Sequence, residues 1–501
     1  MIRPSTDNTR SRTVHRHRPL ETHMRVLFTT ASLAGHLLPL VPVAWALRAA
    51  GHDVLLTTRE NAVPIALRSG LPAVSCGPAA EFTELVDGEP PPPPPDGMSG
   101  QRYAHGHALA RMASGSLAGI GRLARAWRLD LIVSERAESA GPLTAAALGI
   151  PWVRYHWSVS DLREYRHAAD VELAPELDRL GIPGPPEPDL VLDPWPPGLR
   201  RAHAVGHLGV RHVAANGDAA LPDWLFERRD RPRICVTLGT LLPRYGATGA
   251  PARMTNLISE LARLDVELLI AVDDDIVTRQ PPPASAVRHA GRLPLADVLP
   301  TCDAVVTHGG QGTALTAVAA GRPQVVVPHL DDQFDNAEAL SAAGAAVLIP
   351  PSDVTPGAVS AGCAELLGNP VYAKATARLA EDMALMPTPA DAIALRYATE
   401  DLDIGGIVVR KGEQVVGGSG PPDTIRTSFP SRSGSTSPGT TAHRTRHTSG
   451  SASARTTAWA PPWLTRRPRS PSTPCSTASP ASPSPYRRPR WNGSPSRAPG
   501  V

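Results

Sequence analysis

The sequence predicts an α/β protein of two doubly wound parallel-sheet domains, which face each other across a cleft and carry disordered extensions at both ends. Short apolar runs typical of buried strands alternate with helical apolar spacing, and this alternation starts again half-way along the chain. The 501 residues would allow roughly three domains. Both ends lack the aliphatic residues of a core, however, which leaves two globular domains.

The first domain is predicted over residues 24–215. It opens with RVLFTT at 25–30, which is typical of a buried strand, and LLPLVPVAWALRAAG at 37–51 then has helical spacing that ends at a glycine. Three more apolar runs continue the strand series: DVLLTT (53–58), DLIVS (130–134) and WVRY (152–155). EPPPPPPDG at 89–97 is expected to be an extended polyproline segment on the surface.

The second domain is predicted over residues 232–395, after a polar linker at 216–231. Five apolar runs form its strand series: RICVTLG (233–239), VELLIAV (266–272), DAVVTH (303–308), QVVVP (324–328) and AAVLI (345–349). In doubly wound sheets, ligands bind beyond the carboxyl ends of the strands, near the point where the strand order reverses. Functional residues are therefore expected on the loops that follow these strands.

Charge and cysteine content exclude several classes of function. Residues 421–501 hold twelve Arg against one Asp and residues 1–23 hold five Arg against two acids, so the whole-chain net charge of +3 leaves −11 on the central region. An acidic core argues against nucleic acid as a partner. The five cysteines show no paired spacing, which predicts a reduced cytoplasmic protein without disulfides or structural zinc. No apolar run approaches the ~18 residues that span a bilayer.

The turn after the strand DAVVT combines glycines with hydrogen-bond donors. In HGGQGT at 308–313, the glycines allow an anion to approach the backbone, and the N–H groups of the following helix point at that anion. A diphosphate fits this turn, although the turn has neither the Lys of a P-loop nor GxGxxG. A glycine turn with a purely structural role is the alternative.

The loop after QVVVP is crowded with polar side chains. HLDDQFDNAEAL places Asp331, Asp332, Gln333, Asp335 and Asn336 at one strand end. Helix capping is the alternative explanation, but it needs only one such residue. An adjacent Asp and Gln offer the acceptors and donors that sugar hydroxyls require, so a sugar site is expected beside the diphosphate site.

These two segments resemble the donor-binding region of family 1 glycosyltransferases of the GT-B fold, which has two Rossmann-like domains, and the resemblance extends over residues 24–392. The resemblance implies that five residues of the turn hold the diphosphate of the donor: His308, Gly309, Gly310, Gly312 and Thr313. It also implies sugar contacts for Asp332 and Gln333, and a phosphate contact for Thr240 in TLGT. Thr307 stands where many relatives have a second His, a departure that we expect to be tolerated.

The loop after the first strand, TTASLAGHLLPL, contains His36 and no GxGxxG, which disfavours a nicotinamide dehydrogenase. Similar transferases carry their catalytic His in GHxxPL, which implies that His36 takes the proton of the acceptor hydroxyl. An acid ends the DLIVS strand in these relatives, which implies that Glu135 orients His36. Glu138 is the alternative partner. A helix cap for His36 and a solvated charge for Glu135 are the structural alternatives.

Two segments of the first domain, LVPVAWALRAAGHDV and WVRYHWSVSDLREY, resemble bacterial transferases that attach deoxysugars to polyketide and other antibiotic aglycones. Such enzymes commonly use thymidine-diphosphate (TDP) donors. Four residues on and after the WVRY strand are candidates for the wall of a hydrophobic acceptor pocket: Trp152, Tyr155, His156 and Trp157. About half of these side chains are expected to belong to the core instead.

The predicted function is inverting transfer of a deoxysugar from a TDP-sugar to a hydroxyl of a hydrophobic polyketide-type aglycone, in macrolide or related antibiotic biosynthesis. The resemblance implies neither a cofactor nor a metal ion. Two alternatives stay open. One is a truncated or fused product that only binds the nucleotide sugar, and the other is a different GT-B enzyme, such as a nucleotide-sugar epimerase.

The part of the chain after residue 395 divides into two segments. Residues 396–416 are predicted to form a two-stranded hairpin with a Gly-Gly turn, and they resemble a fragment of bacterial cytochrome P-450 proteins. Some related transferases work with a haem-free P-450-like activator protein, so the resemblance implies such a partner. The Arg, Ser, Pro and Thr bias of residues 417–501 is typical of a shifted reading frame, and we expect a disordered, dispensable tail. Residues 1–23 are likewise expected to be a disordered extension.

Overall fold

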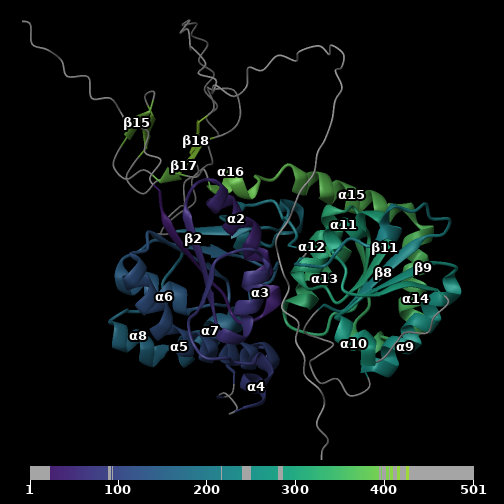
Figure 1. Cartoon of the computed structure of the whole chain (residues 1–501), viewed down its shortest axis with the longest axis horizontal. Coiled ribbons are helices and arrows are strands. Elements are labelled where there is room, and N and C mark those ends of the chain that lie inside the picture. The colour runs from purple at the N-terminus through teal and green to yellow at the C-terminus, as the bar shows by residue number, and fades with distance from the viewer. Residues whose placement is uncertain are drawn as a thin grey trace, which may run out of the picture. The chain divides into compact units, whose positions relative to one another are not determined.

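The computed structural model describes residues 23–88, 92, 94–215, 217–239, 250–279 and 286–393, together with five short strands beyond residue 395. Two separate parallel sheets, of seven and six strands, form its framework (Figure 1). The predicted pair of doubly wound α/β sheets is therefore confirmed.

The first sheet has the strand order β3-β2-β1-β4-β5-β6-β7, and every neighbouring pair is parallel. Its strands are β1 (Arg25–Thr29), β2 (Asp53–Thr58), β3 (Ala73–Ser75), β4 (Leu131–Glu135), β5 (Trp152–Tyr155), β6 (Leu190–Asp193) and β7 (Leu208–Gly209). Val26 and Phe28 point to one face of the sheet and Leu27 to the other. All three side chains are fully buried, because helices cover both faces.

The helices on the two faces come from different parts of the chain. One face packs against α1 (Ala34–Leu37), α2 (Val41–Ala49), α3 (Val63–Arg68) and α16 (Pro389–Ile393). The other packs against α5 (Gly100–Trp127), α6 (Ala140–Leu148) and α8 (Ala174–Leu180). α4 (Phe82–Asp87) and α7 (Arg163–Glu172) pack on α5.

The second sheet has the order β10-β9-β8-β11-β12-β13 and is also parallel throughout. Its strands are β8 (Arg233–Thr237), β9 (Glu267–Ala271), β10 (Val287–Gly291), β11 (Ala304–Thr307), β12 (Gln324–Val326) and β13 (Ala346–Leu348). One face packs against α9 (Ala250–Leu261) and α14 (Pro356–Gly368). The other packs against α11 (Leu295–Val298), α12 (Gln311–Ala319), α13 (Asp332–Ala342) and α15 (Pro370–Ala384), while the short α10 (Asp274–Arg279) follows β9.

The strand order of each sheet reverses at its centre. The reversal lies between β1 and β4 in the first sheet and between β8 and β11 in the second. At a reversal the two following loops leave in opposite directions and open a crevice beyond the carboxyl ends of the strands. The ends of these four strands are therefore the places where the fold positions a site.

All nine predicted strands are present, and four strands of the two parallel sheets were not predicted: β3, β6, β7 and β10. β15 (Leu402–Ile404) and β16 (Ile407–Val409) pair antiparallel, which confirms the predicted hairpin. β14 (Arg396–Tyr397), β17 (Gln414–Gly417) and β18 (Ile425–Thr427) form a further small sheet.

Several expectations from the sequence stay predictions. Residues 89–91 and 93 of the polyproline segment, and the tail apart from its short strands, lie outside the described residues. The domain boundaries and the likeness of residues 396–416 to P-450 proteins also stay predictions. Within the part of the chain that is described, no helix has the length and apolarity needed to cross a membrane.

Two glycines of α5 offer a matched test of its packing. A Cβ at Gly119 would overlap the backbone carbonyl of Cys76, whereas a Cβ at Gly121 would meet only the Arg125 side chain, at 3.6 Å. We expect Gly119→Ala to lower the free energy of unfolding by about 1–3 kcal/mol through overpacking. Gly121→Ala should raise it by up to about 1 kcal/mol through helix propensity. Denaturant unfolding measures both, and equal effects would contradict the close approach of α5 to Cys76.

Candidate active site

His36 and Glu135 meet at the reversal point of the first sheet. His36 lies in α1, directly after β1, and Glu135 is the last residue of the neighbouring strand β4. His36 Nδ1 lies 3.0 Å from Glu135 Oε1. The structure thus brings together the two residues that the family resemblance implied.

The Glu135 carboxylate is fully buried and has four N–H donors around it. Oε1 accepts from the backbone N–H of Ala31 at 3.3 Å, beside His36 Nδ1. Oε2 accepts from the backbone N–H of Ala137 and from the indole of Trp157, both at 2.7 Å. Burial raises the pKa of Glu135, but the positive charge on His36 and these donors outweigh it and hold the pKa below its usual value.

The ionised carboxylate decides the tautomer of His36. A carboxylate only accepts hydrogen bonds, so Nδ1 of His36 carries a proton and Nε2 is left to accept one. Burial lowers the pKa of His36, but the charge and hydrogen bond of Glu135, followed by the charges of Asp332 and Asp331, raise it above 6.5. The His36 side chain is 16% exposed and its ring centroid lies 4.9 Å from that of Trp157. The His36 imidazole is therefore held in one orientation and is partly exposed.

Glu138, the alternative partner of His36, faces other groups. Its carboxylate accepts from Thr29 Oγ1 at 2.5 Å, from the backbone N–H of Ala140 at 2.7 Å and from that of Gly141 at 2.9 Å. Burial raises the pKa of Glu138 to about 7 in spite of these donors. The geometry therefore favours Glu135 as the partner of His36.

The glycine turn lies at the reversal point of the second sheet, between β11 and α12. His308 is packed between Gly239 and Gly310, and a Cβ on either glycine would overlap the imidazole ring. Burial, with the charge of His329, lowers the pKa of His308 to about 4, so the ring is neutral. Its Nδ1 has no hydrogen-bond partner in the described part of the chain.

The backbone of the turn leaves further donors free. Gly309 has a φ of 85°, and a Cβ there would lie 2.8 Å from Val326 Cγ1, so the turn requires glycine. No side chain caps the start of α12, where Gly312 and Thr313 are among the first residues. Gln311 is 6% exposed, and neither of its amide atoms has a partner among the described residues. These groups together suit an anionic ligand.

The residues predicted to contact the donor sugar lie at the start of α13. Asp332 is its first residue, and Asn336 Nδ2 donates to Asp332 Oδ2 at 2.8 Å. Burial, with the charge of Asp331, raises the pKa of Asp332 to about 7. The Gln333 Oε1 atom accepts from the backbone N–H groups of the two residues at 329 and 330, at 2.9 and 3.0 Å, and so holds the loop before α13. Thr240 lies outside the described residues.

The loop before α13 also contacts the helices of the first sheet. Asp331 has a φ of 42°, which is rare for a residue with a side chain. Its Oδ2 lies 2.6 Å from His105 Nδ1 of α5 and accepts from the Tyr165 hydroxyl of α7 at 2.9 Å. Asn336 accepts from the backbone N–H of Val159 at 3.2 Å. These contacts place the predicted sugar residues beside elements of the first sheet.

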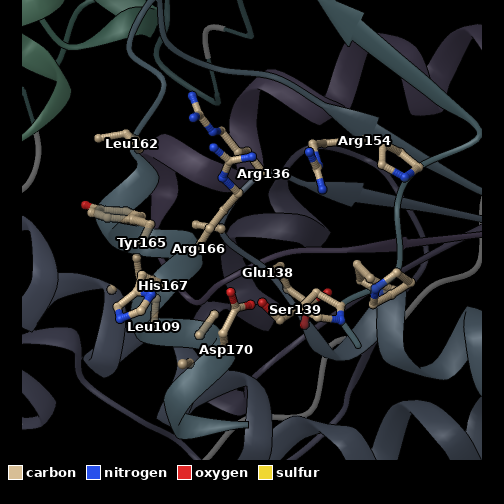
Figure 2. A pocket seen from close by; sticks show the side chains of 18 of the residues that line it. Leu109, Arg136, Glu138, Ser139, Arg154, Leu162, Tyr165, Arg166, His167 and Asp170 are labelled. Atoms are coloured by element: carbon tan, nitrogen blue, oxygen red, sulfur yellow. The ribbon is translucent and has the colours of Figure 1, made fainter. Parts of the chain in front are cut away.

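A cavity of about 700 Å³ lies on the face of the first sheet that α5 to α8 cover (Figure 2). Residues 136–139, which directly follow Glu135, line this cavity. Trp152 and His156, two of the predicted acceptor residues, also line it. Tyr155 lies in the core on the opposite face, and Trp157 contacts the His36–Glu135 pair instead. The acceptor contacts of these aromatic residues stay predictions.

One group of side chains has the spacing of metal ligands within the described ranges. Ligand atoms of His156, Asp193 and His207 lie within 4.8 Å of one another. His207 Nδ1 lies 2.9 Å from Asp193 Oδ2, and the Arg136 guanidinium lies 3.3 Å from His156 Nε2. His156 and His207 of this group line the cavity, and none of the three residues belongs to the His36 pair or the glycine turn.

Two family models match the chain. The N-terminal domain model of the erythromycin biosynthesis protein CIII-like family matches residues 97–239, and the C-terminal domain model matches residues 255–397. The chain belongs to this glycosyltransferase family. Glu135 lies within the first match, and both the glycine turn and Asp332 lie within the second.

The transferase has close curated relatives. It is 38% identical over 368 residues to the L-demethylnoviosyl transferase of Streptomyces niveus, a match that covers 73% of this chain and 96% of the relative. It is 31% identical over 405 residues to the 10-deoxymethynolide desosaminyltransferase of Streptomyces venezuelae, over 73% and 95% of the two chains. The chain is therefore a nucleotide-sugar glycosyltransferase.

Solved structures confirm the GT-B fold. The glycosyltransferase SsfS6 of Streptomyces sp. SF2575, complexed with thymidine diphosphate, matches with a TM-score of 0.65 and 36% sequence identity. The match covers 74% of this chain and 98% of that one. The rest of this chain, which the match does not cover, has about the same number of residues as the two predicted terminal extensions together.

Sequence reasoning missed two features of the site: the arginines of the cavity and the hydrogen bond from Trp157 to Glu135. Trp152 and Arg154 share one face of β5, because side chains alternate along a strand, and Tyr155 points to the other face. That alternation, applied to WVRY, would have separated Tyr155 from the pocket and included Arg154. The contact of Trp157 with Glu135 had no comparable signal, because it depends on how the loop after β5 folds back.

Proposed function

We propose that this transferase moves a deoxysugar from a TDP-sugar to a hydroxyl group of a hydrophobic polyketide-type aglycone, with inversion at the anomeric carbon and without a metal ion. The observation that carries the proposal is the His36–Glu135 pair, 3.0 Å apart at the reversal point of the first sheet. The names of the relatives support the substrate classes, because they include a desosaminyltransferase and a protein complexed with TDP.

The donor diphosphate is assigned to the turn before α12. The neutral His308 ring, the free N–H groups at the start of the helix and the orphaned Gln311 amide offer donors to phosphate oxygens. These donors oppose the charge that develops on the leaving TDP, which is the basis for proposing a metal-independent reaction. Asp332 and Gln333, at the start of α13, are assigned to the sugar.

His36 is assigned the role of general base. Its Nε2 accepts the proton of the acceptor hydroxyl while that oxygen forms a bond to the anomeric carbon and the bond from that carbon to the diphosphate breaks. A single displacement of this kind inverts the anomeric centre. Glu135 fixes the tautomer and stabilises the imidazolium that forms. The cavity that begins after Glu135 is assigned to the acceptor.

The donor assignment predicts a loss of TDP affinity in one of two matched variants. His308→Ala should weaken TDP binding by about 1.5–3 kcal/mol, the contribution of a hydrogen bond to a charged group. His36→Ala removes the same side chain from the other sheet and should bind TDP as the wild type does. Calorimetry measures both affinities, and an unchanged TDP affinity in His308→Ala would refute the assignment.

The base assignment predicts that His36→Ala loses turnover although it keeps its TDP affinity. The wild-type chain, incubated with TDP-deoxysugars and aglycones, should form a glycoside and TDP, and His36→Ala should lower turnover at least ~100-fold. Product formation is measured by mass spectrometry. TDP-sugar binding without transfer would indicate a binding protein, and sugar isomerisation without an acceptor would indicate an epimerase. Wild-type turnover in His36→Ala would place the base elsewhere, with His156 as the next candidate.

The raised pKa of His36 predicts the pH dependence of the reaction. A base must be unprotonated, so kcat/KM should rise through a pKa above 6.5. Glu135→Gln removes the charge that stabilises protonated His36, so turnover should fall less than in His36→Ala and the acid limb should move to lower pH. Glu84→Gln is the control, because it removes an exposed carboxylate of α4 and should leave the acid limb in place. An acid limb that stays in place in Glu135→Gln would contradict the assignment.

A further inference from the structure

One side of the cavity is lined by arginine and histidine side chains. Five side chains, called here the basic wall, line it together: Arg136, Arg154, His156, His203 and His207. The ring centroids of the three histidines lie between 4.7 and 6.0 Å apart. Figure 2 shows Arg136 and Arg154 on the upper side of the cavity, with Glu138 and Asp170 on the lower side.

Arg154 has a charge that nothing in the described part of the chain pairs directly. The residue is half-buried, and its guanidinium lies 5.1 Å from the centroid of the Trp152 ring. It makes no hydrogen bond or ion pair with a described residue. Burial lowers the pKa of Arg154, and the exposed Glu187 opposes this only from beyond ion-pair distance. A guanidinium with five N–H donors and no described acceptor within hydrogen-bond distance is suited to an anionic ligand.

Arg136 adds to this positive charge. Its guanidinium donates to two neutral carbonyl groups, of Ser160 at 2.5 Å and of Asp161, and lies 3.3 Å from His156 Nε2. Burial, and then the charge of Arg154, lower the pKa of Arg136 to about 10. The side chain of Asp161 pairs with Arg166 at 3.1 Å rather than with Arg136. The two arginines therefore repel each other, and neither guanidinium forms an ion pair with a described carboxylate, although Asp161 and Asp332 partly offset the charge of Arg136.

A metal ion is the alternative ligand for this region, because His156, Asp193 and His207 have ligand spacing. The surrounding charges oppose it. The Arg136 guanidinium contacts His156, and Arg200 Nε lies 3.7 Å from Asp193 Oδ2. Both guanidinium groups would repel a divalent cation, whereas both arginines of the basic wall would attract an anion.

We propose that the basic wall binds an acidic group of the acceptor aglycone, a carboxylate in its simplest form, and that Arg154 contacts it directly. This inference rests on the proposed function, since it specifies the acceptor of the same reaction. Apolar side chains of the cavity receive the body of such an acceptor: Leu109, Pro142, Leu143, Trp152, Leu162 and Leu173. Ala137 lines the cavity and also donates its N–H to Glu135, so this part of the cavity wall adjoins the His36–Glu135 pair.

A matched pair of fluorescent hydroxyl acceptors tests the proposal. 6-Hydroxy-2-naphthoic acid and its methyl ester share the naphthalene ring and the hydroxyl group, and the ester replaces the carboxylate charge with a methyl group. The fluorescence of each reports binding to the TDP-loaded chain without any transfer. The wild type should bind the acid about tenfold or more tightly than the ester, the scale of one charge-assisted hydrogen bond. Arg154→Met, which keeps an unbranched apolar stem and removes the guanidinium, should bind the two equally.

Two further variants distinguish the loss of the anion contact from a general effect on folding. Arg154→Lys retains the charge and should recover part of the preference for the acid. Arg122→Met removes an arginine from the exposed surface of α5 and should keep the whole preference. Equal binding of acid and ester by the wild type, or a preference that survives in Arg154→Met, would overturn the proposal. Zn²⁺ binding that is lost in His207→Ala would also overturn it, in favour of the metal.

Transfer assays with the same pair and a panel of TDP-deoxysugars separate this inference from the function on which it rests. Preferred glycosylation of the acid supports both. Equal glycosylation and equal binding of acid and ester would reject the acidic acceptor and leave the transferase function in place. Selective binding of the acid without transfer to any hydroxyl acceptor would keep the anion site and reject the proposed function.

Discussion

The arrangement of the loops at the reversal point of the first sheet depends on the hydrogen bonds to the buried Glu135 carboxylate. A buried carboxylate costs several kcal/mol unless hydrogen bonds and an opposite charge offset its desolvation. Its four N–H donors come from the loop after β1, from α1, from the loop after β4 and from the residue that follows His156. One ion therefore orients the His36 imidazole and also fixes three loops relative to one another.

In the second sheet, His308 is positioned by close packing and not by an ion pair. His308 is neutral and is held between two glycines that leave no room for a Cβ. The glycines at 239 and 310 follow different strands, so a change in either loop moves the same ring. The two reversal points thus use opposite means: an ion pair that raises the pKa of His36, and close packing with burial that lowers the pKa of His308.

The central framework was predictable because buried parallel strands are uninterrupted apolar runs, and all nine runs are strands. The short strands β3 and β7 carry too few apolar residues to give this signal. The resemblance supplied His36 and Glu135, and the geometry brings them together.

The cavity was not predictable in the same way. It depends on α5, which buries a row of apolar residues that includes Leu109, Met112 and Leu117. The Arg and His residues between them make this row difficult to recognise in the sequence.

Neighbouring residues of the loop before α13 also have different roles. Gln333 hydrogen-bonds to its own loop, while Asp331 reaches His105 and Tyr165, a difference that only the backbone geometry determines.

The position of α16 has a consequence for synthesis on the ribosome. This helix follows the whole second sheet in the chain, yet Ala392 is buried in the core of the first sheet, against the face that α2 also covers. The first sheet therefore keeps an apolar groove open while more than 150 later residues, from 233 to 392, are still being translated. Domains generally fold in order as they emerge, at ~5–20 residues per second. The nascent chain thus exposes this groove for several seconds after the rest of the first sheet can form, and the last helix closes it.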